Sequence, residues 1–213
     1  PGGNTGVQMG GWFRKEINTV ADLKGLKMRI PGFAGEVLAK LGASPTNIPS
    51  AELYTALERN TIDALEWVGP SLDLRMGFHK IAPYYYTGWQ EPATELQFMV
   101  NQKAYDSLPA DLQKILTIAM KTAAYDMYSQ STHENGVNLK ALQTEYPDVK
   151  IRTFPQPVMN AIRKANDELL AEFAAKDEET DKILKSIKRY QEQVRAWTKF
   201  ADQAYLESFE SNE

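Results

Sequence analysis

The residues best placed to do chemistry in this chain are an arginine and a Glu-Trp pair, each near the end of an apolar segment. Arg29 lies in the alternating segment 26–30, and Glu66 and Trp67 lie in the segment 62–68. The first segment has the two-residue period of a β-strand, and the second, stopped by Gly69-Pro70, is interpreted as the next strand. If the two strands are parallel, their carboxyl ends face the same edge, where ligands bind in open α/β sheets. A guanidinium there, beside a helix start, favours an anion. We therefore predict a small-carboxylate site; the open alternative is that Arg29 and Glu66 are solvated rim charges.

A further candidate precedes these strands. Gln8 lies in the short apolar piece 7–13, whose glycines let backbones approach closely. One alternative is that this piece is a strand or hairpin that packs Met9, Trp12 and Phe13 into the core. The other is that Gln8 also lends its amide oxygen to the site.

The elements that position these residues predict an α/β fold. Pro31 and Gly32 stop the first strand, and a helix is expected to open at Gly35 and to close at Gly42. Ser50 is the expected N-cap of a second helix. The remaining expected elements are a strand at 95–101, a long helix at 110–144, a strand at 149–153 and helices from 156 to the end.

Two apolar patterns leave alternatives open. The run from Tyr84 to Tyr86 either lines a sugar site or packs in the ordinary way. Near the end of the chain, apolar residues recur at spacings of 4-3-4-3-4-3, which is a heptad seam. A helix with such a seam either packs on its own body or pairs with a second copy of the chain. The seam consists of Ile183, Ile187, Tyr190, Val194, Trp197, Ala201 and Ala204.

Composition argues against several classes of protein. The 213 residues include 24 basic and 28 acidic ones, a formal charge of −4, and no basic stripe suggests a nucleic-acid partner. The chain has no cysteine, which excludes a disulfide framework, a zinc–cysteine cluster and a thiol nucleophile. No apolar run approaches the ~20 residues that span a bilayer. The opening Pro1-Gly2-Gly3 resembles a loop within a longer chain rather than a natural start.

Catalytic motifs are also missing. His79 and His133 lie far apart, and His133 has no second histidine four residues on, as a zinc-protease motif requires. The sequence has no nucleophile elbow, phosphate-cradling loop or dinucleotide fingerprint, and no carboxylates pair at a useful spacing. We therefore predict binding without turnover, not an enzyme.

Five segments of the chain resemble a known family, the solute-binding proteins of tripartite ATP-independent periplasmic (TRAP) transporters. The segments that carry the resemblance are 23–32, 42–45, 52–64, 100–105 and 108–113. Within the family, 8–13 and 65–67 look most like the branch that binds 2-oxo acids or lactate together with a cation. Two departures are the Asp63-Ala64 pair, where many members have Asp-Gly, and the absence of most of the first lobe.

The resemblance implies roles for single residues. Arg29 would hold the substrate carboxylate with its planar fork. Gln8, Glu66 and the backbone oxygen of Trp67 would hold Na⁺ or Ca²⁺, and this cation would also contact the substrate. Gln8 and Trp67 are therefore expected in both the metal site and the substrate site. Gln97 is a further expected contact to the substrate or the metal.

The resemblance also implies a fold and a function. It implies a periplasmic-binding-protein architecture with two lobes, mixed sheets and long C-terminal helices. Residues 1–87 would form the second-lobe core, 88–130 would return to the first lobe, 131–175 would complete the second, and 176–213 would form a long amphipathic helix, a candidate dimer arm.

The implied function is periplasmic capture of a small 2-oxo or 2-hydroxy monocarboxylate with a cation, for delivery to a TRAP membrane permease. The alternatives are a binder of sugar acids or other carboxylates in the same family, and a metal-dependent lyase or decarboxylase of small oxo acids.

Overall fold

The structure is a computed structural model that describes residues 1–210; residues 211–213, the end of the expected helix at 176–213, lie outside the described residues. The chain divides into two units, one covering 1–162 and the other running from 163 to the end. None of the helices in residues 1–210 combines the length and the apolarity that crossing a bilayer requires.

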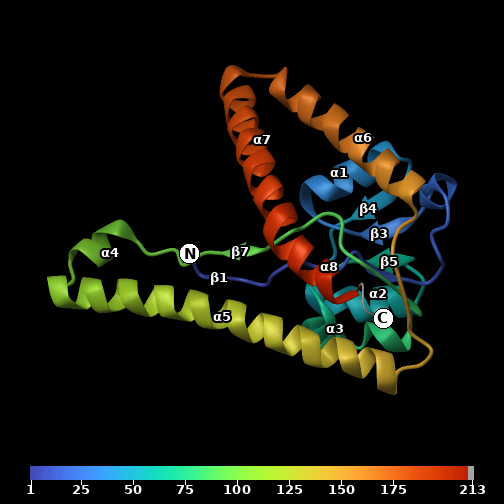
Figure 1. The fold of residues 1–213 in the computed structure, drawn as a ribbon, viewed down its shortest axis with the longest axis horizontal. Helices are drawn as coiled ribbons and strands as arrows, with labels where there is room; N and C mark the ends of the chain where they lie inside the picture. The colour runs from blue at the N-terminus through green and yellow to red at the C-terminus, as the bar shows by residue number, and fades with distance from the viewer. Residues whose placement is uncertain (211–213) are drawn as a thin grey trace. The chain divides into compact units, whose positions relative to one another are not determined.

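The first unit is built on a six-stranded mixed sheet (Figure 1) in the order β4-β3-β5-β2-β6-β8. β3 pairs in parallel with both β4 and β5, β2 lies antiparallel between β5 and β6, and β6 pairs in parallel with β8. The strands are β2 (Gly11–Phe13), β3 (Lys27–Arg29), β4 (Ser44–Thr46), β5 (Ala64–Leu65), β6 (Tyr84–Tyr86) and β8 (Lys150–Arg152). The two site-bearing strands β3 and β5 are therefore parallel, which is the condition for their carboxyl ends to face the same edge.

Short helices follow the strands, and some of their starts differ from expectation. Helix α1 (Gly32–Lys40) begins at Gly32 and not at Gly35, directly after Pro31, whose backbone is extended. Ser50 does not cap a helix; it opens the 3₁₀ turn η2 (Ser50–Glu52) that leads into α2 (Leu53–Glu58). The other elements of this part are η1 (Val20–Leu23), α3 (Pro70–Met76) and η3 (Phe78–Lys80).

The core of the first unit forms where these helices and the sheet meet. Trp12 of β2 stacks on Tyr85 of β6 with 4.0 Å between ring centroids, and Tyr86 stacks on Phe154 at 4.3 Å. Tyr85 and Tyr86 are 0 % and 1 % exposed, so the packing alternative is confirmed for these two tyrosines. The buried cluster around Trp12 also contains Leu53, Leu57, Ile62, Leu65, Phe78, Ala82 and Leu142.

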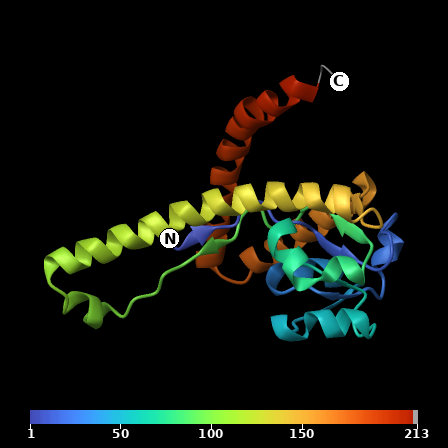
Figure 2. The ribbon, with the colours of Figure 1, turned by 90° about the horizontal axis from the view of Figure 1, so that it is seen from below.

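A second, smaller sheet lies beside a long helix. β1 (Gly3–Asn4) pairs antiparallel with β7 (Glu95–Leu96), which is much shorter than the strand expected at 95–101. After α4 (Gln102–Asp106) comes the single long helix α5 (Ala110–Glu145), close to the expected range. It contacts β1 and, farther along, α3 (Figures 1 and 2).

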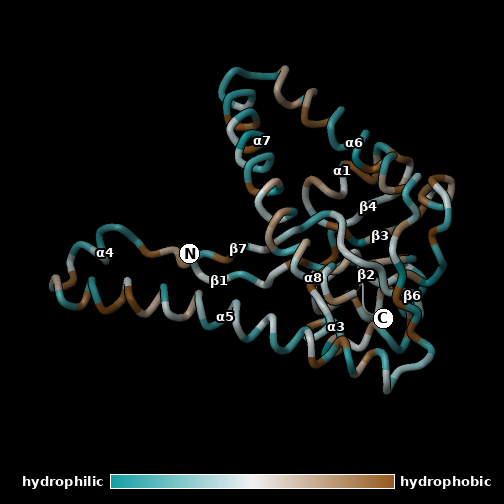
Figure 3. The backbone as a smooth tube through the Cα atoms, viewed as in Figure 1, coloured by the Kyte–Doolittle hydropathy of each residue, from teal (hydrophilic) through white to brown (hydrophobic). Residues whose placement is uncertain are grey.

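Apolar side chains around this small sheet are exposed. Figure 3 shows hydrophobic residues, coloured brown, recurring in the segment after β7 and in the adjoining part of α5. The exposed set is Leu96, Phe98, Met99, Val100, Leu112, Ile115, Ile118, Tyr125 and Tyr128. This part of the first unit therefore contributes little buried core of its own.

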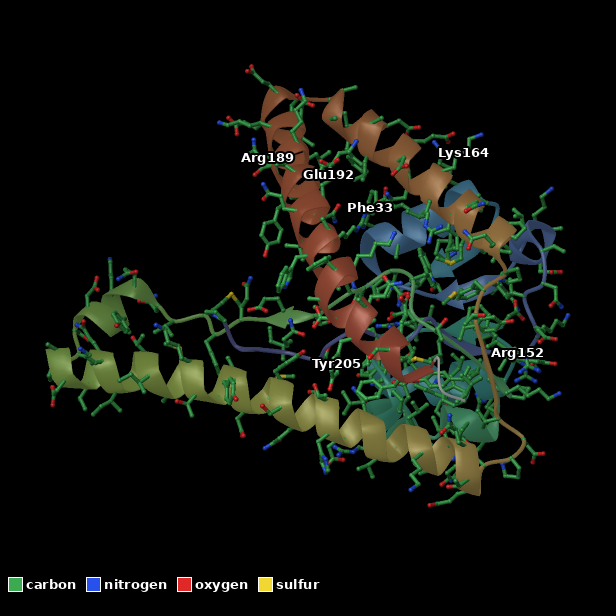
Figure 4. The ribbon with its side chains drawn as sticks, viewed as in Figure 1. Phe33, Arg152, Lys164, Arg189, Glu192 and Tyr205 are labelled. Carbon is green, nitrogen blue, oxygen red and sulfur yellow. The ribbon has the colours of Figure 1, made fainter. Side chains whose placement is uncertain are left out.

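The second unit is helical. It contains the last part of α6 (Gln156–Ala174), then α7 (Glu178–Thr198), a π-helical turn η4 (Lys199–Gln203) and α8 (Ala204–Glu210). The π turn follows Trp197 and includes the expected seam residue Ala201, which is half-buried, whereas Ala204 opens α8. Phe200, Tyr205, Leu206 and Phe209 are exposed there, and Tyr205 (Figure 4) meets Phe209 edge to face.

The far edge of the six-stranded sheet carries an ion pair at the surface. Arg152 of β8, labelled in Figure 4, donates from Nε to Glu16 Oε1 at 2.7 Å. Because Arg152 is exposed and Glu16 only half-buried, solvent screens the pair and it contributes little to stability. The interactions that bear on function lie instead at the ends of β3 and β5.

Candidate functional site

Arg29 and Glu66 meet at the carboxyl ends of two parallel strands. Arg29 pairs in register with Leu65, and the backbone N–H of Glu66 donates to the carbonyl of Arg29 at 3.2 Å. The Arg29 Nη1 donates to Glu66 Oε1 at 2.6 Å and to the Glu66 carbonyl at 2.9 Å. The two residues are 9 % and 3 % exposed, so this is a buried ion pair and not the solvated rim charges of the alternative.

Trp67 holds the arginine from another side. The Arg29 Cζ lies 5.3 Å from the centroid of the Trp67 ring, within the range of a cation–π contact. The Nε of Arg29 is buried and has no hydrogen-bond partner among the described residues. A buried N–H without a partner is costly, so the guanidinium is prepared for an acceptor that a ligand could bring.

Burial perturbs the carboxyl group of Glu66. Loss of solvent raises its pKa from 4.5 to about 7; the Arg29 guanidinium opposes that rise, while the charges of Glu91 and Asp73 add to it. The site thus holds more negative charge than Arg29 neutralises, and a bound cation would stabilise the ionised carboxylate.

The segment that carries Gln8 is tied to the backbone that follows Glu66 and Trp67. The N–H of Met9 donates to the carbonyl of Val68 at 2.9 Å. Gln8 is 4 % exposed, and its Oε1 is buried without a hydrogen-bond partner in the part of the chain that the structure describes. A buried amide oxygen with no donor needs a positive partner, which a cation would supply.

The segment after β6 contributes residues that the sequence analysis missed. The N–H of Gln8 donates to the Glu91 carbonyl at 3.1 Å, and its side-chain Nε2 donates to Thr94 Oγ1. Thr94 in turn donates to Glu91 Oε2 at 2.9 Å. The only available signal was a polar segment directly after a strand, which does not distinguish Glu91 from other loop glutamates.

A glycine makes this close approach of backbones feasible. A Cβ at Gly88 would lie 1.8 Å from the carbonyl oxygen of Gln8, which is far inside contact distance. Any larger residue at this position would therefore push Gln8 away from Glu66 and Trp67.

Gln97 is not brought to this cluster. It is exposed and lies just after β7, against the backbone of Gly2 and away from the six-stranded sheet. Its role in binding remains a prediction.

The donor set suits a hard cation of low charge. One carboxylate, one side-chain amide oxygen and backbone carbonyls are the ligand types that Ca²⁺ and similar ions accept. Within residues 1–210, no group of three or more His, Cys, Asp or Glu side chains is arranged to hold a metal. A site built on nitrogen or sulfur ligands, which zinc requires, therefore does not form among the described residues.

Known proteins resemble the chain over most of its length. A TRAP periplasmic solute-binding protein from Pseudoalteromonas atlantica T6c, solved with bound sodium and pyruvate, is 96 % identical and superposes with a TM-score of 0.93. One from Colwellia psychrerythraea, with bound calcium and pyruvate, is 78 % identical with a TM-score of 0.94. Each match covers 98 % of this chain and 63 % of the other. The predicted α/β periplasmic-binding-protein fold is thereby confirmed.

A curated relative agrees. The monocarboxylate 2-oxoacid-binding periplasmic protein of Nostoc sp. (strain PCC 7120) is 41 % identical over all of this chain, which spans 58 % of that protein. The chain is thus shorter than two thirds of each of these relatives. The family described as bacterial extracellular solute-binding protein, family 7, matches residues 2–177, most of the sequence. The chain therefore belongs to the bacterial extracellular solute-binding protein family 7.

Proposed function

We propose that this protein captures a small 2-oxo or 2-hydroxy monocarboxylate together with Na⁺ or Ca²⁺. The observation that carries the proposal is a buried Arg29–Glu66 pair in which Arg29 Nε has no partner among the described residues, together with a buried Gln8 Oε1, likewise without one, on the segment tied to Val68. The Arg29 N–H lacks an acceptor, which an anion would supply, and the Gln8 oxygen lacks a positive partner, which a cation would supply. The relatives solved with pyruvate and sodium or calcium support this assignment.

The residues present fit such a pair of ligands. Arg29 would donate to the substrate carboxylate, and Gln8 Oε1, the Glu66 carboxylate and the Trp67 carbonyl would hold the cation. Glu91, whose charge acts on Glu66 and whose carboxylate is tied to Gln8 through Thr94, would add negative charge at the cation. The cation supplies a charge that the carboxylate and the 2-oxygen of the substrate can share.

We propose that residues 88–130 belong to a first lobe, whereas 1–87 and 131–175 build most of the second. The exposed apolar side chains around β7 and α5 support this, because a face of that kind is normally covered in a folded protein. Pairing of β1 with β7 groups the first few residues with 88–130. The substrate would bind between the lobes and be enclosed by a hinge motion.

The wider setting is also proposed. The family and the names of the relatives support a periplasmic location and a TRAP membrane permease as the partner that receives the substrate. The helices of residues 176–213 would form a dimer arm. Exposed Ile183, Tyr190 and Trp197 on α7 support pairing with a second copy.

Calorimetry on the full natural protein tests the proposal. Pyruvate should bind in buffers with sodium or calcium and lose affinity in potassium buffer with a chelator. Acetate, which lacks the 2-oxygen, and hydroxyacetone, which lacks the carboxylate, should both bind far more weakly. Tight binding of hydroxyacetone, or pyruvate binding without either cation, would contradict the assignment.

Two assays on the same purified protein distinguish the other candidate functions from the proposed one. Tyr85 and Tyr86 are buried and offer no stacking face to a sugar, which disfavours the sugar-acid binder. A thermal-shift screen in which sugar acids stabilise the protein more than pyruvate would favour that binder instead. Consumption of pyruvate by the purified protein would favour a lyase or decarboxylase.

A further inference from the structure

We propose that Asp73 is a positioning residue for the cation site, acting through the peptide planes on either side of Val68. The inference rests on the proposed function, because the atoms that Asp73 would position are the proposed cation ligands. Asp73 is 0 % exposed and lies in α3, outside the set of residues that would touch either ligand.

One oxygen of Asp73 fixes the direction of the Trp67 carbonyl. Its Oδ1 accepts from the N–H of Val68 at 3.0 Å and from the N–H of Gly69 at 3.0 Å. The Val68 N–H and the Trp67 C=O belong to one planar peptide unit, so holding the first aims the second. The Trp67 carbonyl is therefore held by a residue that it does not touch.

The same oxygen also sets the approach of Gln8. The Gly69 N–H and the Val68 C=O share the next peptide plane, and that carbonyl accepts from Met9 N at 2.9 Å. Met9 directly follows Gln8 in the chain. A single carboxylate oxygen thus orients two consecutive peptide units. The first carries the Trp67 carbonyl, a proposed cation ligand, and the second binds Met9, the neighbour of the proposed ligand Gln8.

The other oxygen anchors the carboxylate itself. Asp73 Oδ2 accepts from Trp12 Nε1 at 3.0 Å and from the Tyr85 hydroxyl at 2.9 Å. These two rings stack on each other in the core, so the anchor is rigid. All four groups facing Asp73 are donors, which is the arrangement that an ionised carboxylate satisfies and an amide does not.

The two oxygens can be tested separately. Asp73→Ala removes both, whereas Asp73→Asn can keep its oxygen on Val68 and Gly69 but turns its NH₂ toward the Trp12 N–H. Trp12→Phe removes that N–H, so the double variant Asp73→Asn with Trp12→Phe restores the backbone contacts without the clash of donors. Leu57→Ala, a core truncation in α2, serves as the control for lost stability alone.

In the full natural protein, the sodium affinity of each folded variant is measured by calorimetry at saturating pyruvate, well below its melting temperature. Asp73→Ala should weaken sodium binding by roughly 10–100-fold, as residues behind metal ligands typically do. Asp73→Asn should weaken it also, and the added Trp12→Phe should recover most of the loss. Leu57→Ala should lower the melting temperature and leave sodium affinity nearly unchanged. Trp12→Phe, which keeps the Tyr85 contact to Asp73, should lose less sodium affinity than Asp73→Asn.

The opposite results overturn the inference. Wild-type sodium affinity in Asp73→Ala, or in Asp73→Asn should the alanine variant not fold, would show that Asp73 only stabilises the fold. An equal loss in Leu57→Ala, or no recovery in the double variant, would do the same. If the wild-type protein shows no sodium-dependent pyruvate binding at all, the proposed function fails first, and this inference fails with it.

Discussion

Replacing Arg29 by methionine should separate ligand recognition from stability more clearly than any other single change. Methionine keeps much of the length of the side chain and removes the guanidinium. The lost contacts are those of Nη1 to Glu66, the cation–π contact to Trp67, and the buried Nε that we assign to the substrate carboxylate. We expect the variant to fold and to lose pyruvate binding.

The expected loss of affinity follows from the number of charged hydrogen bonds. Two such bonds from a guanidinium to a carboxylate, at about 1.5–3 kcal/mol each, amount to about 3–6 kcal/mol. At about 1.4 kcal/mol for each factor of ten, that is a loss of roughly 10²–10⁴-fold. Arg29→Lys should lose somewhat less, because an ammonium keeps the charge but not the fork.

The expected loss of stability depends on pH. Removing one partner of a buried ion pair costs about 3–5 kcal/mol when the other stays charged. Burial already raises the pKa of Glu66 to about 7, and without Arg29 that pKa rises further. The ionised state of Glu66 then opposes folding, so Arg29→Met should lose more stability at pH 8 than at pH 6, where the carboxyl is neutral.

Arg14→Met is the matched control. Arg14 lies in the same unit, and its Nη1 donates to a backbone carbonyl, that of Leu57, at 2.8 Å. Calorimetry with pyruvate at saturating sodium, together with thermal melts at both pH values, should show lost binding only in Arg29→Met. Affinity within threefold of wild type in Arg29→Met, or equal losses in both variants, would refute the role of Arg29.

Three further predictions address the cation, the backbone approach and the helices. Sodium affinity of the wild type should fall as pH drops below about 7, because protons compete with sodium for Glu66, whose pKa burial raises to that value. Sodium titrations of Glu66→Gln should show weaker binding that does not depend on pH. A preserved pH dependence in this variant would contradict the prediction. Gly88→Ala should displace Gln8 and weaken both ligand binding and folding, measured by calorimetry and melting temperature, since its Cβ would overlap the Gln8 carbonyl. Tyr190→Ser with Trp197→Ser should shift a dimer to monomer in light scattering, because both side chains are exposed on α7; an unchanged mass would exclude this face as the interface.

The meeting of Arg29 and Glu66 could be predicted because it depends on short-range patterns. The first strand shows its period within a few residues, the second is a short apolar run stopped by Gly69-Pro70, and parallel pairing then places their ends at one edge. The burial of the pair could not be predicted, because it depends on β2 lying antiparallel between β5 and β6. That pairing joins segments from three parts of the chain, and no local pattern specifies it.

The same distinction explains the residues that were missed. Glu91 and Thr94 reach Gln8 across more than 80 positions, through a polar segment without periodicity. The heptad spacing at the end of the chain predicted α7 well and gave no sign of the π turn Lys199–Gln203 that follows it. Periodicity describes regular elements and says nothing of where they are interrupted.

Two buried carboxylates in this protein, Asp73 and Glu66, differ in how many hydrogen bonds their oxygens can still accept. Asp73 accepts four hydrogen bonds from its own fold, so its oxygens have no capacity left for a ligand. Among the described residues, the Glu66 carboxylate accepts from Arg29 alone, and burial destabilises its charge. A carboxylate that is buried and poorly provided with donors gains most from a cation. The count of unfilled acceptor positions, more than burial or charge, therefore separates the acid that would bind the ion from the acid that would hold its ligands in place.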